Sequence, residues 1–172
     1  MSSNKNGIPM SAYITSGYLH SFFEPDKMIK TITDLRQTIA ASGVKFDAIA
    51  CRGMSGLLVS SPLGMMMEKP VIVVRKGTSG THSGSNVEGY LPVHLKYIIV
   101  DDFVETGATI RTIIRRIGEY YRPDFFRKTA KCVGVFLYKT YDPDDYYRYQ
   151  GYLKKNVHGP IQGLSQFQGL SH

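Results

Sequence analysis

The sequence predicts a three-layer α/β domain in which helices cover both faces of a parallel sheet. Short apolar runs bounded by polar or glycine residues alternate with helical stretches along the 172 residues. The apolar runs are continuous, which is typical of parallel strands that are covered on both faces. The chain is also long enough for one domain with its own core, since domains commonly contain about 100–150 residues.

The first predicted element is an amphipathic helix, and strands and helices alternate after it. Met28, Ile32, Leu35 and Ile39 recur at helical spacing, and Pro25 suits a helix start. The order of strand, helix and strand implies right-handed crossovers, with ligands at the carboxyl ends of the strands. We expect helices at 25–41, about 55–68 and 109–120, and strands at 47–51, 71–74, 97–100 and 132–138.

Composition limits the kind of protein. The net charge of +7 suits either nucleic acid or a heavily phosphorylated small molecule as ligand. We interpret the basic residues from Arg111 to Lys131 as a solvated helix face and its following loop, and expect no nucleic-acid partner. Cys51 and Cys132 lie in apolar stretches without a CxxC pattern, as reduced thiols of a cytoplasmic protein would. No apolar stretch approaches the ~20 residues of a membrane span, so no membrane association is expected.

Two adjacent carboxylates end the predicted strand at 97–100. Asp101 and Asp102 repel each other unless a cation or hydrogen-bond donors lie opposite them. A ribose diol, alone or with Mg²⁺, has that character. The alternative is that both acids only begin a turn.

A possible anion cradle follows the acid pair. The stretch "ETGAT" combines a glycine, two hydroxyl groups and the first turn of the next helix. Backbone N–H groups and the helix dipole at such a place can point at one phosphate. The alternative is a simple helix cap at Thr109. The predicted phosphate-binding residues are Glu105, Thr106, Gly107, Ala108 and Thr109.

Residues 97–110 resemble the 5-phosphoribosyl 1-pyrophosphate (PRPP) binding motif of the type I phosphoribosyltransferases. In that motif an apolar strand ends in two acids and a T-G-x-T loop follows, as it does here. The resemblance implies that Asp101 and Asp102 hold the ribose hydroxyls, directly or through water and metal, and that 105–109 bind the 5′-phosphate. It extends with weaker motifs over about 45–140.

The stretch "CRGMSG" at 51–56 is similar to the pyrophosphate loop of that family. It follows one predicted strand and opens the next helix. The resemblance implies that Arg52 and Gly53 contact the diphosphate and that the peptide between them can be cis. Taken alone, the pattern is equally typical of an ordinary turn between strand and helix.

A long polar segment follows the strand at 71–74. The stretch "RKGTSGTHSGSNVEG" is glycine-rich and too polar to form a core of its own. The resemblance implies a mobile loop at about 76–95 that closes over PRPP, with Arg75, Lys76 and His82 on the pyrophosphate. The alternative for His82 is an exposed loop histidine. Because no lysine lies between 77 and 95, the loop departs from the orotate enzymes, which carry a further lysine there.

The base is expected to bind under a small hood formed by about 1–24 and 139–172, outside a core of about 25–138. Glu105 occupies the place where 6-oxopurine enzymes have an acidic general base, and Lys139 follows its strand as their base-binding lysine does. Tyr141 is a second candidate for the base. The resemblance therefore favours a 6-oxopurine.

The implied activity is Mg²⁺-dependent transfer of the 5-phosphoribosyl group from PRPP to a nucleobase, with release of pyrophosphate. Asp101, Asp102 and Glu105 would be catalytic, and the two aspartates would hold Mg²⁺ through water. Residues 1–172 would form one domain and pair as a homodimer. The alternatives are an enzyme for adenine, orotate or another base, or a PRPP-binding regulator that binds RNA or DNA.

Overall fold

The computed structural model describes residues 24–77, 86–102, 107–121, 128–138 and 143–163, with side chains omitted for 143–149. Its helices are α1 (Pro25–Ala41), α2 (Gly53–Met67), α3 (Ala108–Tyr120) and α4 (Pro143–Asn156). Its strands are β1 (Ala48–Arg52), β2 (Val71–Val74), β3 (Val87–Glu88), β4 (His94–Asp101), β5 (Thr129–Leu137) and β6 (Ile161–Gly163).

The strands form one sheet in the order β3-β2-β1-β4-β5-β6. Every pair is parallel except β2 with β3, which is antiparallel. Because β1, β2, β4 and β5 run in the same direction, their carboxyl ends meet at one edge of the sheet. We call this the carboxyl edge, and the opposite one the amino edge.

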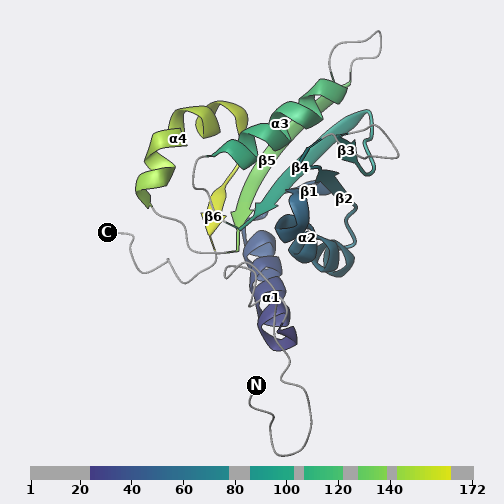
Figure 1. The fold of residues 1–172 in the computed structure, drawn as a ribbon, viewed down its shortest axis with the longest axis vertical. Helices are drawn as coiled ribbons and strands as arrows, with labels where there is room; N and C mark the ends of the chain where they lie inside the picture. Colours follow the sequence, from purple (N-terminus) through teal and green to yellow (C-terminus); the bar gives the residue numbers. More distant parts are fainter. Residues whose placement is uncertain (1–23, 78–85, 103–106, 122–127, 139–142, 164–172) are drawn as a thin grey trace, which may run out of the picture.

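Helices cover both faces of the sheet, so the predicted three-layer α/β class is confirmed (Figure 1). On one face, Leu35 of α1 and Leu63 of α2 pack against Ile98 of β4. On the other face, Ile113 of α3 and Leu153 of α4 pack on the sheet. All five of these side chains are fully buried, as the continuous apolar runs predict.

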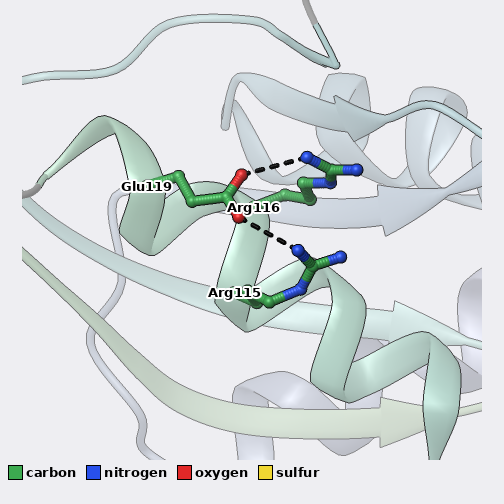
Figure 2. Close-up of polar contacts among 3 residues, drawn as sticks. All are labelled: Arg115, Arg116 and Glu119. Atoms are coloured by element: carbon green, nitrogen blue, oxygen red, sulfur yellow. Dashed lines mark hydrogen bonds and ion pairs between the residues drawn. The ribbon is translucent and has the colours of Figure 1, made fainter. Parts of the chain in front are cut away.

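The outer side of α3 carries arginines that the structure pairs locally. Arg115 and Arg116 each donate a hydrogen bond of 3.1 Å to Glu119 (Figure 2). Arg111 lies over the ring of Tyr152, 5.1 Å from the ring centroid, and so links α3 to α4. The pairings of Arg115 and Arg116 are those of a solvated helix face, as the sequence predicts for this part of α3, whereas the following loop at 122–127 lies outside the described residues.

Helix and strand positions agree closely with the predictions up to β5. Helix α1 and strand β2 have the predicted bounds, and the other predicted elements are shifted or extended by one to three residues. The structure adds β3 inside the segment predicted as a mobile loop. It also adds α4 and β6 inside the segment predicted as hood, and β6 extends the main sheet beside β5. No helix in the described part of the chain is long and apolar enough to cross a membrane.

Candidate functional site

The carboxyl edge gathers charged groups from four neighbouring strands. Arg52 is the last residue of β1, Lys76 follows β2 by two positions, Asp101 is the last residue of β4, and Tyr138 follows β5. The register places Asp101 opposite Leu137, and the Tyr138 N–H donates to the Asp101 backbone oxygen at 3.1 Å. The structure therefore brings together residues that are far apart in the sequence.

One member of the acid pair at the end of β4, Asp101, has a strongly raised pKa. The Asp101 side chain is buried, with 3% of its surface exposed, and Asp102 is half-buried. Burial raises the pKa of Asp101, the neighbouring charge of Asp102 also raises it, and Lys76 lowers it, so that the pKa is about 8. Burial and the neighbouring carboxylate thus disfavour the ionised form of Asp101, and a ligand that brings hydrogen-bond donors or a cation would favour that form.

The turn from β1 into α2 lies directly against Lys76. Gly53 has a positive φ of 68°, and a Cβ at this position would lie 2.6 Å from Cε of Lys76. Among the described residues, the buried Nε of Arg52 has no hydrogen-bond partner. A buried donor without a partner is rare in proteins and suits an anionic ligand. The described peptide bonds are all trans, so the cis peptide considered for Arg52–Gly53 is not observed.

Helix α3 begins beside the acid pair. Gly107 precedes it with φ 62° and ψ 0°, a left-handed conformation that glycine adopts without strain. The Arg111 N–H donates to the Gly107 oxygen at 2.9 Å, which fixes the first turn. The first turn contains no acidic side chain to oppose an anion. Ala108 and Thr109 therefore lie at the positive end of a helix dipole, as the phosphate cradle requires.

Arg75 has a different partner from the one expected. Its guanidinium forms an ion pair of 2.5 Å with Glu88 of β3, and its backbone N–H donates to Asn86 at 3.0 Å. In this structure Arg75, which directly follows β2, therefore binds to residues in and directly before β3 and holds the two ends of the segment between these strands together. Its predicted contact with pyrophosphate stays a prediction.

Five predicted site residues lie outside the described part of the chain. These residues are Glu105, Thr106, His82, Lys139 and Tyr141. Their roles on the phosphate, the pyrophosphate and the base stay predictions.

The structure adds two polar residues that the sequence reasoning did not include. Tyr138 is 4% exposed and Ser55, in the first turn of α2, is 7% exposed. Burial raises the pKa of the Tyr138 hydroxyl, the charges of Asp102 and Asp101 raise it further, and the neighbouring Ser55 lowers it. The Tyr138 side chain is therefore buried close to the acid pair. The sequence offered one indication of Tyr138 as a site residue, because it is a polar side chain at the end of the apolar run "CVGVFLY".

The described residues fit a weakly held Mg²⁺ better than a protein-bound metal. They contain no group of three or more His, Cys, Asp or Glu side chains that could hold a metal ion. Two adjacent carboxylates remain at the carboxyl edge. Mg²⁺ commonly uses one or two carboxylates, several waters and substrate phosphates, so this donor set is compatible with it.

Sequence comparison relates the chain to orotate phosphoribosyltransferases. No protein-family model matches the chain. It is 26% identical over 117 residues to an orotate phosphoribosyltransferase of Archaeoglobus fulgidus, covering 62% of this chain and 63% of the relative. It is 28% identical over 118 residues to one of Pyrobaculum aerophilum, covering 62% and 61%. The chain thus matches about three fifths of the length of these curated relatives.

Solved structures show the same fold. The adenine phosphoribosyltransferase of Saccharomyces cerevisiae matches with a TM-score of 0.62 at 19% identity, over 91% of this chain and 89% of that one. The orotate phosphoribosyltransferase of Aeropyrum pernix matches with a TM-score of 0.58 at 18% identity, over 92% and 83%. At such identities the likeness establishes the fold alone. The expected 6-oxopurine preference gains no support from these relatives, which are named for orotate or adenine.

Proposed function

Because the chain has the fold of the type I phosphoribosyltransferases and is related in sequence to orotate members of that family, we propose that it transfers the 5-phosphoribosyl group of PRPP to orotate. The C1–oxygen bond to the diphosphate breaks, a bond from C1 to a ring nitrogen of the base forms, and pyrophosphate leaves. The observation that carries the proposal is the meeting of the acid pair, the turn at Arg52 and the start of α3 at the carboxyl edge.

Each part of that edge matches one part of PRPP. The positive end of α3 and Gly107 receive the 5′-phosphate. Asp101 and Asp102 accept hydrogen bonds from the ribose hydroxyls. Arg52, with its buried Nε, and Lys76 oppose the charge of the diphosphate. The two aspartates would hold Mg²⁺ through water, and the ion would neutralise diphosphate oxygens when bound.

The base is proposed on chemical grounds as well as on the relatives. Orotate carries a carboxylate at neutral pH, whereas hypoxanthine, guanine and adenine are neutral. Lys139 directly follows Tyr138 in the sequence, beyond the end of β5, and a lysine there would suit an anionic base. This proposal replaces the 6-oxopurine preference. The segment 77–95 contains no lysine. We therefore assign the role of the loop lysine on the diphosphate to Lys76, which directly precedes this segment.

A homodimer is proposed from the outer face of α2. Helix α2 contains no charged residue, and its exposed side carries large apolar side chains. A helix that is apolar all round is normally covered. A second copy of the same face would cover it in a two-fold contact. The exposed apolar residues are Met54, Leu57, Met65 and Met66.

Pyrophosphate release tests the proposed activity. Purified protein is mixed with PRPP, Mg²⁺ and one of orotate, uracil, adenine, hypoxanthine or guanine. We expect kcat/KM for orotate to exceed that for every other base by at least about 100-fold, a ratio typical of a site that pairs a buried charge or hydrogen bond with its substrate. A preference for hypoxanthine or guanine would contradict the choice of base, and no release with any base would contradict the activity.

A further inference from the structure

Lysines from two connecting segments and from strand β4 meet at the amino edge, at the opposite end of the strands from the proposed active site. Lys45 lies just before β1, Lys69 just before β2, and Lys96 near the start of β4. Together with Val44, Phe46 and Asp47 they line a hollow of about 400 Å³. The ammonium of Lys69 lies over the Phe46 ring, 5.7 Å from its centroid, so the hollow has an aromatic wall.

A second basic hollow lies at the same end of the sheet. It has a volume of about 170 Å³ and lies between α3, β5 and the end of α4. Its basic lining residues are Lys131, Lys155 and His158. The His158 backbone N–H donates to the Cys132 oxygen at 2.8 Å, which fixes the end of α4 against the first half of β5.

The lysines that line the two hollows are neighbours at the amino edge, where one hollow lies on the face covered by α1 and α2 and the other on the face covered by α3 and α4. Lys96 of β4 and Lys131 of β5 are direct partners in the parallel register, and both are exposed. Like charges opposite each other on neighbouring strands are destabilising. An anionic ligand would remove this repulsion.

Acidic residues do little to offset this charge. Asp47 is the one acidic side chain among the residues that line either hollow. Its Oδ2 already accepts a hydrogen bond of 2.8 Å from the Lys96 backbone N–H. The hollows therefore present five lysines and one carboxylate, as part of a chain with net charge +7.

We propose that the amino edge binds the phosphate backbone of a single-stranded nucleic acid. A strand that passes over the amino edge from one face of the sheet to the other can place successive phosphates on the lysines of both hollows, whereas one small anion cannot contact both. Lysine ammonium groups neutralise phosphates as point charges and read no base sequence, so the binding is not sequence-specific. The proposal does not depend on the proposed enzymatic function, because the two sites lie at opposite edges of the sheet.

Fluorescence anisotropy with a labelled 15-nucleotide oligo-U or oligo-dT tests the proposal. Affinity is measured between 50 and 200 mM NaCl for the wild type, for Lys96→Glu with Lys131→Glu, and for a control. The control, Lys27→Glu with Lys30→Glu, makes the same charge change on exposed lysines of α1. We expect the amino-edge variant to bind at least about 10-fold more weakly at 50 mM NaCl. The slope of its log binding constant against log salt concentration should be smaller in magnitude by about two. The control should change affinity less than about 3-fold.

Three results would overturn the proposal. The first is no binding of either oligonucleotide by the wild type at 50 mM NaCl. The second is an equal loss in both double variants, which would mean that net charge alone attracts the strand. The third is binding of a nucleoside triphosphate as tight as that of the 15-mer, which would mean a site for a small anion. If the glutamate variant fails to fold, Lys96→Gln with Lys131→Gln replaces it, with Lys27→Gln and Lys30→Gln as control and the same expected order of affinities.

Discussion

At the scale of single residues, the carboxyl edge is built from groups whose placement costs stability. Asp101 is buried next to a second carboxylate, and Arg52 buries a donor that has no hydrogen-bond partner among the described residues. A core selected only for packing would contain neither of these features. They make physical sense as parts of a binding site, where a ligand supplies what the protein lacks.

Asp101→Asn should stabilise the unliganded protein at neutral pH. The pKa of Asp101 is about 8 in the folded protein and 3.8 in its ordinary state, so ionisation of this carboxyl lowers stability as pH rises from about 4 to 8. The variant removes that loss. We expect its advantage to grow from near zero at pH 4 to about 1–2 kcal/mol at pH 8, measured by urea unfolding. Asp26→Asn on α1 is the control, and an advantage that does not depend on pH would contradict the account.

Gly107→Ala should lower the stability of the protein, whereas Gly118→Ala, near the other end of α3, should not. Alanine at φ 62° costs about 1–2 kcal/mol, and Gly107 is also one of the residues proposed to receive the phosphate. Gly118 lies inside α3, and a Cβ added to it meets nothing within 4 Å. Its replacement should add about 0.5–1 kcal/mol of helix stability. Thermal unfolding and PRPP titration compare the two, and equal PRPP affinity in both variants would contradict the phosphate role of Gly107.

At the scale of elements, a periodic apolar pattern makes a helix or strand predictable, and elements without such a pattern are missed. The helix 25–41 is recovered because Ile32, Leu35 and Ile39 form one apolar stripe that is buried against the sheet. Helix α4 was missed because its sequence, "PDDYYRYQGYLKKN", has a glycine and little apolar periodicity. Strand β6 has three residues, and pairing with β5 rather than its own propensity holds it in place.

Leu153→Ala should show that α4 is part of the core. The Leu153 side chain is fully buried in the cluster formed with α3 and the sheet. Its truncation should lower the free energy of unfolding by about 2–5 kcal/mol. The exposed neighbour Lys154→Ala should change it by less than about 0.5 kcal/mol. Equal stabilities in urea unfolding would mean that α4 does not pack as the structure has it.

Some residues of the candidate site could be predicted from the sequence, and others could not. Strand ends with chemistry-bearing residues, such as Asp101 after "YIIV" and Arg52 after "AIAC", can be placed at one edge from topology alone. The ion pair of Arg75 with Glu88 depends on side-chain packing between segments, so the sequence does not reveal it. The same holds for the buried Tyr138 side chain close to the acid pair. Base preference was harder still, because the residues expected to contact the base lie in segments without a periodic pattern.

At the scale of the whole molecule, the two ends of the sheet have different characters. The carboxyl edge mixes carboxylates, a helix start and cations from β1 and β2, which suits a ligand with a sugar and several phosphates. The amino edge presents lysines with a single carboxylate among its lining residues. Among the described residues, the two edges therefore differ in charge, and one sheet can serve two kinds of anionic ligand.

The apolar outer face of α2 should control assembly. Met65 is 81% exposed on this face, whereas Ile29 of α1 is 62% exposed outside it. We expect Met65→Glu to convert a dimer into a monomer, because a buried and unpaired charge in the contact is costly. Ile29→Glu, the matched control, should leave the dimer intact. Light scattering after size exclusion measures both, and a wild type that is monomeric at tens of micromolar would contradict the dimer.

The central claim is that Asp101 and Asp102 hold the reacting sugar at the carboxyl edge. The most direct test is pyrophosphate release from PRPP and orotate by the variant Asp101→Asn with Asp102→Asn, in parallel with the wild type. The amides keep the size of the side chains and remove their charge, so the fold should persist while turnover falls by at least about 100-fold. A variant that is folded and releases pyrophosphate at a near-normal rate would contradict this account of the site.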